Sequence, residues 1–90
     1  MNELDATLAE RGTRYGRFTK HAEVTQQLKK VMFRHRPREE LEPDMVEALE
    51  MIVHKIGRIL NGDPGYADSW TDIAGYAKLV ADRLATGKEV

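Results

Sequence analysis

The stretch "PDMVEALEMIVHKIGRILNGDPG", residues 43–65, shows both the beginning and the end of a long helix. Pro43 suits the first helical turn, and Asp44 is favourable at the positive end of the helix dipole. Asn61-Gly62 is typical of a helix C-cap, and the Asp-Pro-Gly that follows predicts a turn. Between these signals, apolar residues recur at helical spacing and form one stripe: Met45, Leu49, Ile52, Val53, Ile56 and Leu60. We predict an amphipathic helix whose stripe faces the core.

Two further long helices are predicted, one on each side of this segment in the chain. Residues 19–34 form the first, which Pro37 terminates because proline breaks a helix. Residues 66–85 form the second, and the tail, residues 86–90, is expected to be frayed. Their apolar faces consist of Val24, Leu28, Val31 and Met32 in the first helix and of Trp70, Ile73, Tyr76, Ala77, Val80 and Leu84 in the second.

A short N-terminal helix is expected over residues 2–11, with Leu4 and Leu8 on one side and a stop at Gly12. The following "RGTRYGRF" has two glycines around an Arg-Tyr pair and predicts an elbow, so residues 1–18 form a lead-in. No segment shows strand-type alternation. We therefore predict one all-α domain, residues 1–90, built as a small antiparallel bundle of three main helices plus a short N-terminal helix.

The size of the chain favours self-association. Ninety residues bury a limited fraction of their surface, and the sequence contains no cysteine. Disulfides and cysteine-based metal sites are therefore excluded. Oligomerisation is the remaining common way to stabilise so small a chain, so we expect a homo-oligomer that completes the bundle.

The charge balance argues against two classes of partner. Fourteen basic and fifteen acidic residues give a formal net charge of −1, whereas general nucleic-acid binding needs a strong basic excess. No apolar run is long enough to span a bilayer, so no membrane partner and a cytoplasmic location are expected. The basic "KKVMFRHRPR" is followed at once by the acidic "EELEPD". This pair of runs is either a solvated helix end or a phosphate-facing rim.

The segment "DSWTDIAGYAKL" places a glycine, Gly75, in the middle of a predicted helix. Such a glycine costs ~1 kcal/mol relative to alanine. Helical spacing puts Gly75 on the side that carries Asp68 and Asp72, away from the apolar face. We interpret it as a position where another helix, a second subunit or a flat ligand approaches the backbone closely.

Two pairs of acids raise the possibility of a metal site. Glu47 and Glu50 lie on one helix, and Asp68 and Asp72 lie on the next. If they converged, their oxygens could hold Mg²⁺, which could polarise a phosphoryl group. The alternative is that they are solvated surface carboxylates.

Four residues are candidates for holding an anion: Arg14, Tyr15, Lys55 and Arg58. Arginine grips phosphate in a bidentate way, and Tyr15 or Tyr76 could stack on a base. The alternative is salt bridging to nearby glutamates on the helix surface. The histidines are not expected to form a site: His21 and His35 are interpreted as structural, and His54 as the partner of Glu50 one turn earlier.

Three segments together resemble a small family of bacteriophage and prophage proteins: the early "RYG", then "ALEMIVHKIGRILNGDP", then "DSWTDIAGYAKLV". The similarity covers residues 11–84 and implies a location in the cytoplasm of an infected or lysogenic bacterium. The residues that match its motifs are Tyr15, Gly16, Lys55, Arg58, Asp68, Asp72, Gly75 and Tyr76.

The layout is also similar, more distantly, to the all-α nucleotide pyrophosphohydrolases of the MazG type. That resemblance implies an E-x-x-E motif on one helix, an E-x-x-D motif on the next, Mg²⁺ as cofactor and cleavage of nucleoside triphosphates. Glu47 and Glu50 match the first motif, whereas Asp68 and Asp72 are spaced one residue too far for the second.

Three functions remain open. The first is a small oligomeric phage protein that binds a phosphorylated nucleotide between subunits without hydrolysis or cofactor, as anti-defence proteins do when they sequester cyclic nucleotide immune signals. Its ligand-binding residues would be Arg14, Tyr15, Lys55, Arg58, Asp72 and Tyr76. The second is a Mg²⁺-dependent pyrophosphohydrolase with Glu47, Glu50, Asp68 and Asp72 as metal ligands. The third is a protein-interaction module without a ligand.

Overall fold

The computed structural model describes residues 2–87 and is all-α, as predicted. Its helices are α1 (Glu3–Tyr15), α2 (Phe18–His35), α3 (Pro43–Asn61) and α4 (Ala67–Thr86), with a short 3-10 turn, η1 (Arg38–Glu40), between α2 and α3. Residues 88–90 of the predicted tail lie outside the described range. Within that range no strand is present, and no helix is both long enough and apolar enough to cross a bilayer.

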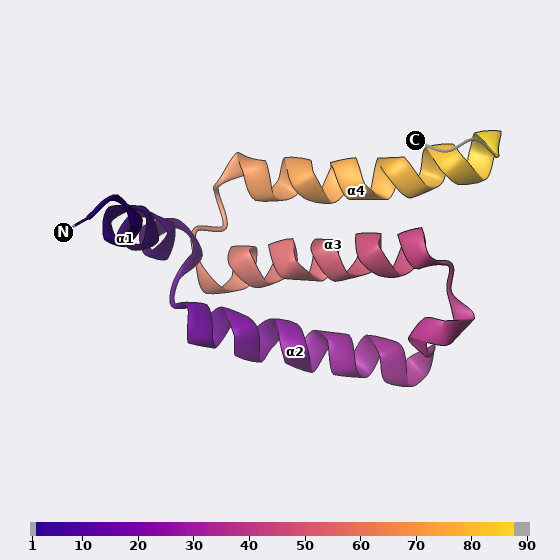
Figure 1. Ribbon diagram of the computed structural model, residues 1–90, viewed down its shortest axis with the longest axis horizontal. Coiled ribbons are helices and arrows are strands. Elements are labelled where there is room, and N and C mark those ends of the chain that lie inside the picture. The colour runs from indigo at the N-terminus through magenta and orange to yellow at the C-terminus, as the bar shows by residue number, and fades with distance from the viewer. Residues whose placement is uncertain (1, 88–90) are drawn as a thin grey trace.

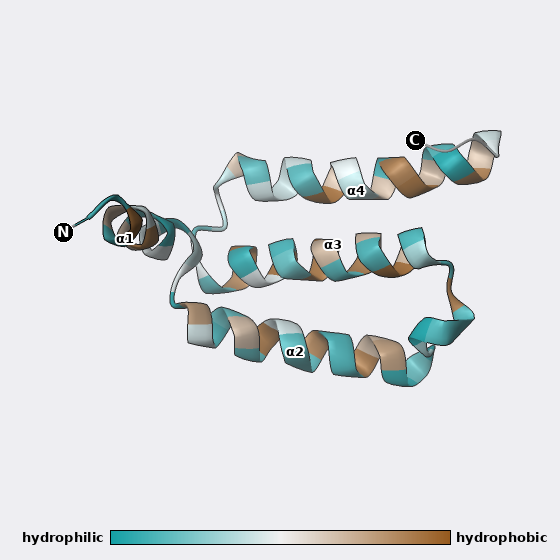
Figure 2. Cartoon of the chain, viewed as in Figure 1, coloured by the Kyte–Doolittle hydropathy of each residue, from teal (hydrophilic) through white to brown (hydrophobic). Residues whose placement is uncertain are grey.

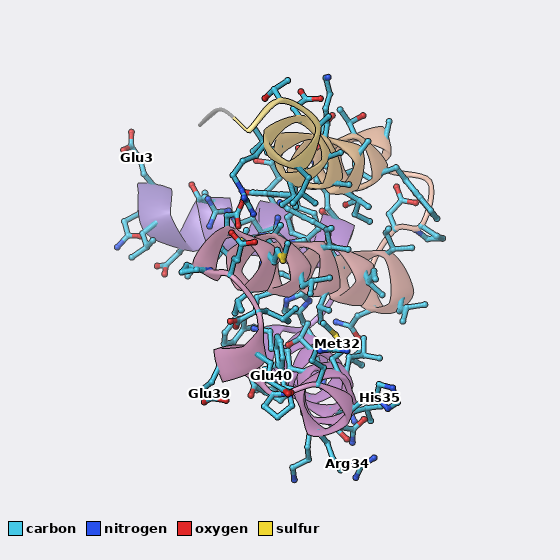
Figure 3. The ribbon with its side chains drawn as sticks, turned by 90° about the vertical axis from the view of Figure 1, so that its right-hand side faces the viewer. Glu3, Met32, Arg34, His35, Glu39 and Glu40 are labelled. Carbon is cyan, nitrogen blue, oxygen red and sulfur yellow. The ribbon has the colours of Figure 1, made fainter. Side chains whose placement is uncertain are left out.

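The three long helices lie antiparallel in a single row, with α3 in the middle (Figure 1). Seen end-on, α4, α3 and α2 are stacked one above the other, and α1 projects to one side of the row (Figure 3). The antiparallel order is as predicted, and the three long helices form an open layer. The radius of gyration is accordingly 15.2 Å, against about 12 Å for a globular chain of this length.

The helix ends follow the capping signals, with one exception. α3 runs from Pro43 to Asn61 and is capped by Gly62, as the sequence indicates. The first helix, however, passes through Gly12, where a stop was predicted, and ends at Gly16. Gly16 has a φ of 79°, which a residue with a side chain rarely adopts, whereas Gly12 keeps helical geometry. The elbow is therefore confined to Gly16 and Arg17.

The middle position of α3 explains why its apolar stripe is only partly buried. α3 packs on α2 along one edge and on α4 along the other, and its buried residues are Ala48, Val53 and Gly57. Of the predicted stripe only Val53 is buried, while Leu49 and Leu60 are exposed. A helix with neighbours on nearly opposite sides needs small residues where it contacts each of them. The large apolar residues of the stripe lie between the two contacts and therefore stay partly exposed. Figure 2 shows the hydrophobic positions recurring along all three long helices.

The apolar face predicted for α4 is only partly the face that packs, since Ile73, Tyr76 and Val80 are half-buried whereas Ala77 is exposed. Ser69 is the buried residue of α4, and Asp72 and Arg83 form ion pairs with α3. Trp70 and Leu84 are each 56% exposed. The Trp70 indole Nε1 donates a hydrogen bond to the carbonyl of Pro64 at 2.8 Å, which holds the ring beside the loop that joins α3 to α4.

Candidate anion-binding site

The last residues of α1 and the elbow after it are attached to the end of α3 by hydrogen bonds to their backbone carbonyls. The side-chain amide of Asn61 donates to the carbonyls of Tyr15 at 3.1 Å and Arg17 at 3.0 Å. The Asp63 backbone N–H donates to the Arg14 carbonyl at 2.6 Å. The two chains approach so closely that a Cβ on Gly62 would lie 2.1 Å from the Arg14 carbonyl oxygen. These contacts fix α1 across one end of the three-helix layer.

A cavity of about 780 Å³ lies between α1, α2 and α3 at this junction. Three arginines line it: Arg11 from α1, Arg17 from the elbow and Arg58 from α3. Tyr15 and Phe18 supply aromatic surface, and His21 and His54 lie at its wall. None of the described residues that line the cavity carries a carboxylate. The cavity therefore concentrates positive charge beside aromatic rings.

The Arg58 guanidinium is held against an aromatic ring. Its central carbon lies 4.0 Å from the centroid of the Tyr15 ring, which is a cation–π contact. The Tyr15 ring in turn meets the Tyr66 ring edge-on, with centroids 6.0 Å apart. Arg14 lies on the other side of this pair, with its guanidinium 4.7 Å from the Tyr66 centroid. The stacking positions Arg58 without using its hydrogen-bond donors, so these donors remain available to an anion.

Two histidines meet at the wall of the cavity. The Nε2 of His21 and the Nδ1 of His54 are 3.2 Å apart, and the rings meet edge-on. His21 is only 5% exposed. His21 is thus buried, as expected of a structural residue, but His54 contacts His21 and does not pair with Glu50 as predicted. Glu50 instead bridges Lys29 and Arg38, because the face of α3 that carries His54 and Glu50 packs against α2.

The histidine pair is held in its neutral form. Burial, then the positive charge of nearby groups such as His21 and Arg58, lowers the pKa of His54 to about 4. Burial and Arg58 also lower the pKa of His21 below its usual value. One ring can then donate and the other accept in the contact between them. Protonation of either ring would place a positive charge at the contact between α2 and α3.

We predict that the protein loses stability as the pH falls from about 7 to 5. A histidine whose pKa is lower in the folded chain than in the unfolded chain binds its proton mainly after unfolding, so acid favours unfolding. The effect begins near the unfolded pKa of about 6.5 and continues towards the folded value of about 4 for His54. We expect a loss on the order of 1 kcal/mol after discounting for the partial exposure of His54.

Thermal unfolding measured at intervals across this pH range checks the prediction. His54→Gln keeps a hydrogen-bonding side chain but removes the titrating group, so its unfolding temperature should change less between pH 7 and 5. An identical pH dependence in the variant would show that the histidine pair is not the source.

A comparison with models of protein families shows to which family the chain belongs. Residues 2–84 match the model of a family described as a domain of unknown function, DUF6378. The chain belongs to the DUF6378 family. No curated protein and no solved structure matched the chain. The DUF6378 match includes all of α1, α2 and α3, so every residue that lines the cavity lies within the domain.

The structure divides the predicted ligand-binding residues of this DUF6378 domain into two places. Tyr15 and Arg58 meet at the cavity, and Arg14 lies beside them. Lys55 and Asp72 instead form an ion pair at 2.9 Å across the seam between α3 and α4. Lys55 points towards α4, whereas Arg58 points towards α1. Tyr76 lies on α4, is half-buried and does not line the cavity.

The four acids proposed as metal ligands are dispersed over the surface. Glu50 bridges Lys29 at 3.4 Å and Arg38 at 3.3 Å, on the side of α3 that faces α2. Asp68 accepts a hydrogen bond from the Tyr66 hydroxyl at 2.9 Å, and Glu47 is exposed. Across residues 2–87, no three His, Asp or Glu side chains come together in a way that could hold a metal ion. The negative charges of Glu50 and Asp72 are balanced by the lysine and arginine side chains with which they form ion pairs.

Most of the described residues that line the cavity were not predicted from the sequence as ligand-binding, among them Arg11, Arg17, Phe18, His21 and His54. One signal for Arg11 was available. If α1 continues through Gly12, Arg11 and Tyr15 lie one turn apart on the same side of the helix. The histidine pair joins residues 33 positions apart, and no local pattern indicates such a contact.

Proposed function

We propose that this DUF6378 protein binds a small phosphorylated nucleotide in the cavity between α1, α2 and α3 and does not hydrolyse it. The observation that supports this most directly is the composition of the lining: three arginines, two aromatic rings and no carboxylate among the described residues. Arginine binds phosphate oxygens through paired N–H donors. Aromatic rings supply a surface on which a base can stack.

The dimensions and exposure of the cavity suit such a ligand. Its volume of about 780 Å³ falls within the range of roughly 300–1,000 Å³ that is usual for small-molecule sites. Phe18 stands at its edge with 77% of its surface exposed, so its ring is accessible for stacking. Arg58 lies deeper, against Tyr15. A ligand could therefore place phosphates towards Arg58 and a planar group towards Phe18.

The arrangement of the acids favours binding over hydrolysis. A pyrophosphohydrolase of the kind that the MazG resemblance implies needs carboxylates that converge on Mg²⁺. Here Glu50 and Asp72 are neutralised by Lys29, Arg38 and Lys55. The resemblance to phage proteins supports a finer proposal: the protein acts in an infected bacterium, and the nucleotide is a cyclic immune signal that the protein sequesters.

We predict that Arg58→Ala weakens nucleotide binding at least tenfold. A charge-assisted hydrogen bond to phosphate contributes ~1.5–3 kcal/mol, and ~1.4 kcal/mol corresponds to a factor of ten. Titration calorimetry with a panel of mononucleotides and cyclic dinucleotides measures the affinity. The same titration in EDTA, followed by chromatography of the nucleotide, should show unchanged binding and unchanged ligand.

Lys55→Ala is the matched control. Lys55 also carries a positive charge on α3, but it forms an ion pair with Asp72 between α3 and α4, away from the cavity. Weaker binding in Lys55→Ala and normal binding in Arg58→Ala would place the site between α3 and α4 and contradict the cavity proposal. Release of pyrophosphate that depends on Mg²⁺ would contradict binding without hydrolysis. Helical circular dichroism should be unchanged in both variants, since neither residue belongs to the buried core.

A further inference from the structure

The row of helices α2, α3 and α4 has two different sides. α1 crosses one of them, and in Figure 3 Glu3 of α1 lies to the left of the row while His35 of α2 lies to the right. Arg58 marks the α1 side of α3 because it stacks on Tyr15. Asp68 marks the same side of α4, since it is joined to Arg14 through the Tyr66 hydroxyl. The side opposite these residues carries no part of α1, and we call it the bare side.

Helical geometry assigns residues to the bare side. At 100° per residue, the positions about 160–180° around α3 from Arg58 and around α4 from Asp68 face away from α1. They are Leu49, Ile56 and Leu60 of α3 and Ala77 and Leu84 of α4, with Trp70 close to the same direction. Every residue of α3 and α4 within about 60° of these directions is uncharged. In contrast, Asp44, Asp72, Lys55 and Arg83, which form ion pairs between α3 and α4, all lie towards the α1 side.

The bare side leaves large apolar side chains in water. Leu60 is 67% exposed, and Trp70 and Leu84 are each 56% exposed. Monomeric soluble proteins rarely expose contiguous apolar patches larger than a few hundred Å². A surface of this kind is expected to be covered in solution.

The total surface shows how much is left uncovered. The accessible surface is 6662 Å², whereas a compact monomer of this mass exposes roughly 5,400 Å². The excess of about 1,300 Å² is larger than the ~800 Å² that each partner buries in a standard interface. The chain therefore carries enough spare surface for one stable interface.

We infer that a second copy of this chain covers the bare side and that the protein is a dimer of two three-helix layers packed face to face. Each copy has the same uncovered side, and a two-fold axis lets one copy cover the other with the same residues. The part of the bare side that α3 and α4 form is uncharged, so it has no repulsion against the same part of a second copy, and it offers no basic groups to a nucleic acid or a lipid headgroup. The α1 cavity of each copy would face outward, so dimerisation and ligand binding use opposite sides and can be tested separately.

The mass in solution tests this inference. Light scattering on the unaltered protein at micromolar concentration should give about twice the chain mass of 10.3 kDa. Leu60→Glu and Leu84→Glu each place a charge on the bare side and should give the mass of one chain. Leu79→Glu is the matched control, because Leu79 is 48% exposed on the same helix as Leu84 but lies on the α1 side. Its mass should remain that of the dimer.

Trp70 provides a second measurement that needs no substitution. It is the single tryptophan of the chain, so its emission should shift to shorter wavelength as the concentration rises and the dimer forms. If the glutamate variants unfold, a concentration-dependent shift in the unaltered protein together with a folded, dimeric Leu79→Glu still supports the inference. A monomeric mass with an emission that does not change with concentration overturns it. So does a Leu79→Glu variant that is monomeric while Leu60→Glu and Leu84→Glu remain dimeric.

Discussion

Gly62→Ala is expected to release α1 from α3 and to abolish ligand binding in the cavity. A Cβ on residue 62 would lie 2.1 Å from the Arg14 carbonyl oxygen and 2.3 Å from the Tyr15 Cα. Both neighbours are backbone atoms, so no side chain can rotate away, and the two segments have to separate. Separation breaks the hydrogen bonds that Asn61 and Asp63 make to the elbow. We expect a loss of ~2–4 kcal/mol, at ~0.5–1.5 kcal/mol for each hydrogen bond.

Limited proteolysis and calorimetry together measure this effect. Cleavage within α1 should become fast, whereas α2, α3 and α4 should stay helical because their mutual contacts are unchanged. Gly65→Ala is the control in the same loop, since its Cβ would meet only the Asp63 carboxylate oxygen, at an ordinary 3.4 Å. Protection of α1 and nucleotide affinity that are equal in the Gly62 and Gly65 variants would contradict this account of the junction.

The sequence predicted the helices better than it predicted their packing. The bounds of α3 follow from Pro43 at its start and Gly62 at its end, because capping is a local interaction. Which side of α3 packs is decided by two neighbouring helices and is not local. The contacts use small residues, Ala48 and Gly57, which do not contribute to a pattern of large apolar residues. The visible stripe, Leu49 and Leu60 included, lies partly on the uncovered side.

The candidate site was predictable only where the chemistry of single residues indicated it. Tyr15 and Arg58 were chosen for their chemistry, and the structure places them in contact. Lys55 was grouped with Arg58, but three residues along a helix amount to about 60° around its axis. Those 60° are enough for Lys55 to face α4 while Arg58 faces α1. The approach of His21 to His54 depends on the register between α2 and α3, which no single segment specifies.

A close approach to the helix backbone was expected at Gly75. Within the chain, the glycine that allows two helices to pack closely is instead Gly57. A Cβ on Gly57 would lie 2.6 Å from the Thr25 Cγ2 and 3.0 Å from the His21 ring. At Gly75 a Cβ would meet nothing within 4 Å among the described atoms. Gly57 is buried where α2 crosses α3, and Gly75 is exposed on α4. Within one chain, therefore, α2 approaches Gly57, and no helix approaches Gly75.

We predict opposite effects for the same substitution at these two positions. Both glycines lie inside helices, so alanine gains ~1 kcal/mol of helix propensity at each. At Gly57 this gain is outweighed, because Thr25 is branched and buried and His21 is buried behind it, so neither can move without opening the seam. Overpacking of this kind costs ~1–3 kcal/mol, and more where the neighbours are rigid. We expect Gly57→Ala to be destabilised by ~1–2 kcal/mol and Gly75→Ala to be stabilised by up to ~1 kcal/mol.

Urea unfolding of the two variants beside the unaltered protein, at equal protein concentration and without ligand, measures this difference of ~1–3 kcal/mol between the variants. The gain in helix propensity from alanine is the same at both positions. The difference in stability between the two variants therefore depends only on the atoms that surround each glycine. Gly57→Ala should also alter the histidine pair, since the His21 ring has to move, and the imidazole NMR signals of His21 and His54 would show it. Equal stability in the two variants would contradict the α2–α3 register on which the wall of the cavity depends. Destabilisation by Gly75→Ala would instead show that a second chain approaches α4 on its α1 side.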